Sequence, residues 1–137
     1  MLRTLAALLV SCALLSACDT VSPPDADLSG VYSGTVDIES EPYAFSFTIT
    51  DEGDELRVTE GRMQFADGYC NSVRGSGLHS TGDENPRVAL TVRFCGGYLA
   101  FHGDRTSANA LTGEVSGFLP NGRTAFFPSV IELTSEP

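Results

Sequence analysis

The stretch YAFSFTIT, residues 43–50, decides the fold class, because bulky apolar side chains alternate along it with smaller ones. Neighbouring side chains of an extended strand point to opposite faces, so a repeat of two residues indicates a strand with one buried face. Tyr43, Phe45, Phe47 and Ile49 share one face in this pattern. We therefore expect them to point into the core of a β-sheet.

The same alternation extends in both directions from this stretch, starting at Leu28, and short Gly, Asp, Asn and Pro turns interrupt it. No helical repeat of useful length occurs. The predicted strands are Gly30–Ile38, Tyr43–Thr50, Leu56–Phe65, Tyr69–Leu78, Arg87–Cys95, Tyr98–Asp104, Ala110–Leu119 and Thr124–Leu133. About eight strands joined by short loops predict an all-β domain, an antiparallel up-and-down meander closed as a small barrel. A β-sandwich is the alternative.

Two irregularities in the alternation predict β-bulges. The apolar phase changes by one residue across Gly61, and it changes again near Pro128, which cannot donate a ladder hydrogen bond. Glu60 shares the phase of the apolar residues before the first slip. It is therefore the acidic residue to inspect for an inward position.

Two cysteines of the domain test the strand register. Gly96–Gly97 has the composition of a two-residue hairpin turn. If the preceding hairpin turns near residues 81–83, Cys70 lies directly across from Cys95. We therefore predict a cross-strand Cys70–Cys95 disulfide, which an oxidising compartment would allow.

The N-terminus has the order of a secretory signal. Arg3 precedes an apolar run from Leu5 to Leu15 that is too short to span a bilayer, and small residues follow it. The succession Leu15-Ser16-Ala17-Cys18 resembles the lipobox of bacterial lipoproteins. The resemblance implies cleavage before Cys18 and a diacylglycerol on its thiol, so the protein would be held on a membrane of the cell envelope. The expected organisation is a signal at 1–17, a lipidated tether at 18–27 and a barrel domain at 28–137.

Charge narrows the range of partners. The chain has 18 acidic and 8 basic residues and a formal net charge of −10, and every basic residue is arginine. Removal of a signal containing Arg3 would make the charge more negative still. This composition argues against nucleic acid and anionic membrane surfaces as partners.

Motifs for catalysis are absent from the sequence. No G-x-S-x-G elbow occurs, and the predicted register separates His79 from His102, which argues against a shared metal. We therefore expect no enzyme, no cofactor and no metal site, and instead a binding or structural role.

One alternative is a carrier of a small apolar ligand. Gly30-Val31-Tyr32 resembles the G-x-W opening of lipocalins, with tyrosine in place of tryptophan. The resemblance implies a cavity inside the barrel. Its lining would comprise Tyr32, Phe45, Phe47, Val92, Phe94 and Phe101, which otherwise fill an ordinary core.

A second alternative is an envelope protein as partner. The last two predicted strands have apolar residues on both faces, so some of these residues would be exposed as a patch. Phe118, Phe127 and Ile131 are the candidates. Small envelope barrels that inhibit lysozyme are similar to this chain in anchor, size and disulfide, without a shared binding-loop motif.

Overall fold

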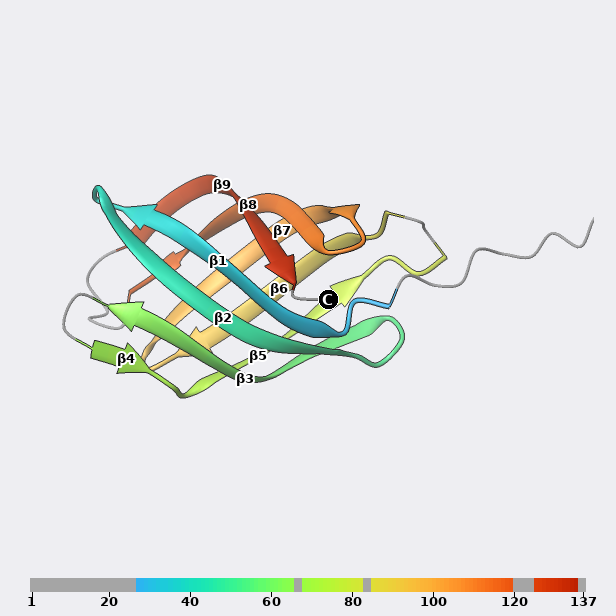
Figure 1. Ribbon diagram of the computed structural model, residues 1–137, viewed down its shortest axis with the longest axis horizontal. Helices are drawn as coiled ribbons and strands as arrows, with labels where there is room; N and C mark the ends of the chain where they lie inside the picture. Colours follow the sequence, from blue (N-terminus) through green and yellow to red (C-terminus); the bar gives the residue numbers. More distant parts are fainter. Residues whose placement is uncertain (1–26, 66–67, 83–84, 120–124, 136–137) are drawn as a thin grey trace, which may run out of the picture.

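The computed structural model describes residues 27–65, 68–82, 85–119 and 125–135; for Phe65 and residues 125–129 it describes the backbone alone. Every regular element in these ranges is a β-strand (Figure 1). The first five strands are β1 (Gly30–Ile38), β2 (Glu41–Asp51), β3 (Glu55–Phe65), β4 (Gly68–Cys70) and β5 (Val73–His79). The others are β6 (Arg87–Phe94), β7 (Gly97–Ser107), β8 (Ala110–Phe118) and β9 (Ala125–Ser135).

The strands form a closed antiparallel barrel, as the sequence predicted. The pairing runs β2-β1-β9-β8-β7-β6-β5-β3, and β2 also pairs with β3, which closes the ring. The β1–β9 seam is short and consists of the pairs Tyr32–Ser135 and Ser33–Thr134. Strand β4 is an additional short strand that pairs with the end of β3. Each of the eight ring strands therefore has a partner on both sides, and the β1–β9 seam leaves part of two strand edges unpaired.

Side-chain alternation fills the barrel with one apolar core. In β2, Phe45, Phe47 and Ile49 are buried and Tyr43 packs against the core. This confirms the prediction from residues 43–50. Strand β6 alternates in the same way, and its four bulky apolar residues are all buried: Val88, Leu90, Val92 and Phe94.

Both predicted irregularities are present. The β2–β3 register shifts between Thr48 and Ile49, where β3 has one extra residue, Thr59. The bulge therefore precedes Gly61, and Glu60 points outward and is exposed. The β8–β9 register shifts between Val115 and Gly117.

The predicted strand Tyr69–Leu78 is wrong as one continuous element. It breaks at residues 71–72, so Cys70 belongs to β4 and pairs with Met63 instead of lying across from β6. Strand β5 then pairs with β6 two residues away from the expected register, with Gly77 opposite Leu90. A shift of two residues keeps each side chain on its face, which is why the core prediction survives.

The β6–β7 turn also lies one residue earlier than predicted. Cys95 and Gly96 form it, both with positive φ (42° and 89°), and Phe94 pairs with Gly97. Gly97 is buried, and a Cβ there would meet the carbonyl oxygen of Phe118 and the ring of Phe94. Gly97 is therefore required for close packing inside β7. Cys95 and Gly96 form the turn in its place.

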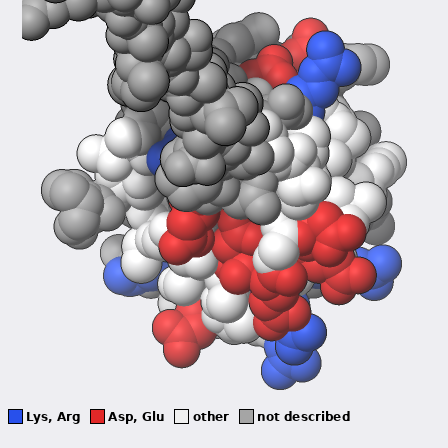
Figure 2. Space-filling model, turned by 90° about the vertical axis from the view of Figure 1, so that its right-hand side faces the viewer, with Lys and Arg blue, Asp and Glu red and all other residues white. Residues whose placement is uncertain are grey.

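The barrel has two distinct ends. The chain enters beside the β2–β3 turn, because the backbone N–H of Leu28 donates to Asp51. Acidic side chains gather over this end (Figure 2), where residues 51–55 contribute four of them. The β6–β7 turn lies at the opposite end, since successive strands reverse direction (Figure 1). No helix in the described ranges is long and apolar enough to cross a membrane.

Candidate functional site

Among the described residues, the interior of the barrel is packed with apolar side chains. All six residues predicted to line a cavity are buried, at 5% exposure or less: Tyr32, Phe45, Phe47, Val92, Phe94 and Phe101. A void between Phe45, Phe47, Val92 and Phe94 has a volume of about 10 Å³. That volume is at the lower limit for a single water molecule, so this void offers no room for an organic ligand.

The outer face carries a more distinctive arrangement. Four outward side chains from four neighbouring strands form one row, because Arg74 pairs with Arg93, Arg93 with Tyr98, and Tyr98 with Phe118. We call these four residues the outer row. The rings of Tyr98 and Phe118 are 5.3 Å apart between centroids. Two cations thus lie directly beside an aromatic pair.

A groove borders the outer row. Its volume is about 730 Å³, and its lining includes Arg74, Arg93, Tyr98 and the hydroxyl side chains of Ser72 and Thr91. The neighbouring row toward the middle of the strands has only small residues, which leave the larger side chains standing above the surface: Ser76, Thr91, Ala100 and Ser116. The groove therefore combines cationic, hydroxyl and aromatic groups.

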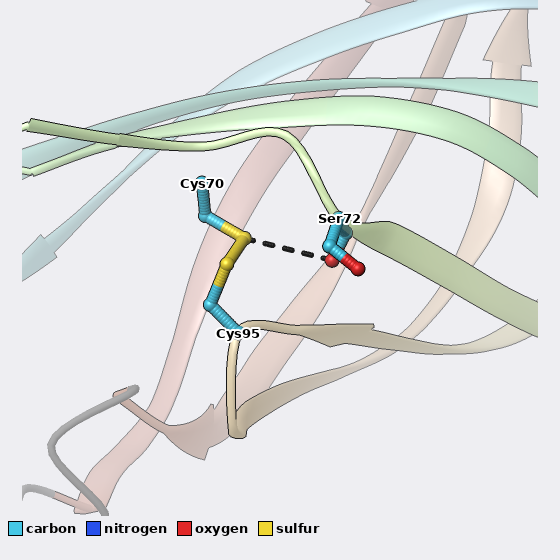
Figure 3. The surroundings of a disulfide bond; sticks show 3 residues. All are labelled: Cys70, Ser72 and Cys95. Atoms are coloured by element: carbon cyan, nitrogen blue, oxygen red, sulfur yellow. Dashed lines mark hydrogen bonds between the residues drawn. A yellow bond between two sulfur atoms is a disulfide. The ribbon is translucent and has the colours of Figure 1, made fainter.

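The disulfide fixes one edge of this groove. Cys70 and Cys95 are bonded, as predicted, with their Cα atoms 6.0 Å apart (Figure 3). Sγ of Cys70 also lies 3.5 Å from the carbonyl oxygen of Ser72; a disulfide sulfur carries no hydrogen, so this is a packing contact. The bond joins β4 to the β6–β7 turn instead of linking two paired strands. It thereby holds the turn that borders the groove.

The described arginines differ in their partners. Arg57 pairs with Glu52, Arg87 lies near Asp104, and Arg105 donates to the carbonyl oxygens of Ser107 and Ala108. Arg62 stacks over the ring of Tyr69, 3.5 Å from its centroid. Within the ranges that the structure describes, Arg74 and Arg93 are the two without an acidic, carbonyl or aromatic partner. They are also the two that face each other.

The predicted apolar patch on the last strands does not form as proposed. Phe118 is exposed, at 40%, but Ile131 is buried in the core. Ile131 pairs with Gly113 and shares the inner face of β9 with Leu133. The side chain of Phe127 and the predicted lipidation site Cys18 lie outside the described residues.

The two histidines lie in different environments. His79 is buried, with Nε2 3.1 Å from Oδ1 of Asp51 and Nδ1 3.1 Å from the carbonyl oxygen of Ser80. His102 is exposed and pairs with Ala89. No cluster of three or more metal-ligating side chains occurs in the described part of the chain.

Comparison with known proteins adds no assignment, because no protein-family model and no curated protein matches this chain.

The outer row was missed by sequence reasoning for a specific reason. In the predicted register, Arg74 faces Thr91 and Arg93 faces Ala100, so the two arginines never meet. With the observed registers of β5–β6 and β6–β7, the sequence would have placed Arg74, Arg93 and Tyr98 in one row.

Proposed function

We propose that the protein is a lipid-anchored module of the bacterial cell envelope that binds its target on the outer face of a filled barrel. The observation that carries the proposal is the contrast between a packed interior and an external groove of about 730 Å³. Ligand sites combine a concave surface with a few polar groups in defined positions, and the groove beside the outer row has both. A carrier role would require internal volume that the void near Phe45 does not offer.

Two further observations support the proposed location in the cell envelope. The Cys70–Cys95 disulfide is typical of proteins that fold in an oxidising compartment. The lipobox-like residues 15–18 favour attachment by lipid at the N-terminus. The chain enters the barrel beside Asp51, so the tether and the groove belong to opposite ends. A target could therefore reach the groove without approaching the membrane.

Site-specific photo-crosslinking in the bacterial host tests the proposal. A photoreactive residue in place of Ala100, beside the groove, should form a specific adduct. The same residue in place of Thr35, an exposed position on β1, is the matched control. Equal adducts at both positions, or an adduct at Thr35 alone, would show that the groove is not the binding surface.

A further inference from the structure

We infer that the groove binds a small organic oxyanion, with its carboxylate or phosphate group between Arg74 and Arg93 and its apolar part against Tyr98 and Phe118. This inference rests on the proposed function and names the ligand class of that same site. A groove of about 730 Å³ lies within the range of small-molecule sites.

The first step of the argument concerns charge. Like charges directly opposite each other on neighbouring strands destabilise a sheet, whereas opposite charges stabilise it. This chain has 18 acidic residues, yet none of those described lies beside Arg74 or Arg93 in the row. The other described arginines have partners. The repulsion between the two arginines therefore lowers the stability of the sheet locally, and a bound anion would relieve that repulsion.

The second step concerns geometry. A guanidinium group presents a planar set of donors that matches the oxygens of carboxylate and phosphate, and its hydrogen bonds to them are charge-assisted. The two arginines lie opposite each other on the paired strands β5 and β6, so the hydrogen-bond ladder fixes the positions of their Cα atoms. The disulfide holds the adjacent turn. The backbone positions of both cations are thus fixed before any ligand arrives.

The third step concerns the aromatic pair. Tyr98 and Phe118 are 39% and 40% exposed and lie on the same row as the arginines. Exposed rings beside cations match a ligand that carries an apolar ring or chain next to its anionic group. Inorganic phosphate would contact the arginines and leave the two aromatic rings without a partner group on the ligand.

The test measures binding of four probes to the purified full chain in a non-ionic detergent: phenyl phosphate, benzoate, inorganic phosphate and phenol. Signals of the arginine side chains in NMR spectra report which guanidinium groups respond. We expect phenyl phosphate or benzoate to bind in a saturable way, about fivefold more tightly than inorganic phosphate, and phenol not to bind. Whichever anion binds more tightly identifies a phosphate or a carboxylate ligand.

Variants locate the site. Arg74→Gln or Arg93→Gln should weaken binding by about tenfold, and Tyr98→Ala should remove the preference over inorganic phosphate. Arg57→Gln, at the opposite end of the barrel, is the matched control. Arg74→Gln should also raise the melting temperature without ligand and abolish its rise with ligand, a combination that misfolding cannot produce.

Two results would overturn the inference. One is the absence of saturable binding by both organic anions, and the other is an equal loss of affinity in the Arg57→Gln control. If the probes fail while crosslinking at position 100 still gives its specific adduct, the ligand class is wrong and the proposed function stands. If crosslinking also fails, both are wrong.

Discussion

Asp51 is the residue that secures the end of the barrel where the chain enters. Its carboxylate accepts hydrogen bonds from the backbone N–H groups of Leu28 and Gly53, at 2.9 and 3.0 Å, and contacts the ring of His79. Leu28 itself is fully buried. A single side chain therefore joins the first residues of the domain to β2 and β5.

Replacing Asp51 by asparagine should lower the free energy of unfolding by about 1–3 kcal/mol, because an amide cannot accept from all three groups. Urea denaturation at neutral pH measures the change. Glu52→Gln, which alters an exposed ion pair with Arg57, is the control and should change stability by less than about 0.5 kcal/mol. Similar losses in the two variants would argue against a special role for Asp51.

Tyr32, at the seam between β1 and β9, makes the folding stability of the protein depend on pH. Burial raises the pKa of its phenol above the ordinary value of 10.0, and the nearby Ser135 hydroxyl and Arg105 only partly offset this. The buried neutral phenol contributes stability that is fully present below about pH 10. That contribution is lost as the pH rises from there through the raised pKa of the folded state.

The variant Tyr32→Phe should therefore show a smaller loss of stability than the wild type as the pH rises above about 10. Chemical denaturation at several pH values in this window gives the comparison. Parallel stability curves for the two proteins would mean that the Tyr32 phenol does not contribute to alkaline unfolding.

At the scale of the strands, glycine allows β5 to pack closely against β6. Gly75 and Gly77 lie on the inner side of β5 between Val73 and His79. A Cβ on Gly75 would collide with the carbonyl oxygen of Thr91. The strand can bend sharply around the core only because these positions lack a side chain.

Gly75→Ala should lower the free energy of unfolding by about 1–3 kcal/mol, since the backbone of β6 would have to move. Gly68→Ala in β4 is the matched control, because a Cβ there meets no atom within 4 Å. Its effect should be below about 0.5 kcal/mol. Denaturant titration of the two variants decides the matter, and equal effects would contradict the packing argument.

Alternation in the sequence was enough to predict most of the strands and their buried faces, but it merged β4 and β5 into one strand. The disulfide partners Cys70 and Cys95 were correct, whereas the cross-strand pairing expected for them was not. Alternation could not fix the register, because pairing depends on where strands break and turn. The break at residues 71–72 and the turn at Cys95 each moved the pairing by two residues. A two-residue error keeps inner residues inside, but it changes every neighbour on the outer face. The core was therefore predictable from Phe45 and Val92, whereas the Arg74–Arg93 pair was not.

At the scale of the whole molecule, the charge distribution complements the proposed anchor. The acidic turn at residues 51–55 lies at the end where the chain enters the barrel, because Leu28 donates to Asp51, and acidic side chains gather on this face (Figure 2). A tether attached there would turn this end toward the membrane. Anionic headgroups would repel it. The barrel would then stand away from the bilayer and present the groove outward.

The anchor itself is tested by Cys18→Ala, which should move the protein from the membrane fraction to the soluble fraction, because the lipid would have no attachment point. Cys12→Ala changes the other cysteine of the N-terminal segment and should leave the protein on the membrane. Retention of the Cys18→Ala protein on membranes would show that lipidation of this residue is not what holds it.

The disulfide bears on when the protein becomes competent to bind. Cys95 adopts a left-handed backbone, with φ of 42°, which residues other than glycine seldom adopt, and its side chain is bonded to Cys70. Before export the two thiols would remain reduced, and the turn beside the groove would lack its covalent link. If the protein is exported as proposed, oxidation would act as a maturation step that couples its arrival in the envelope to the completion of the proposed binding surface.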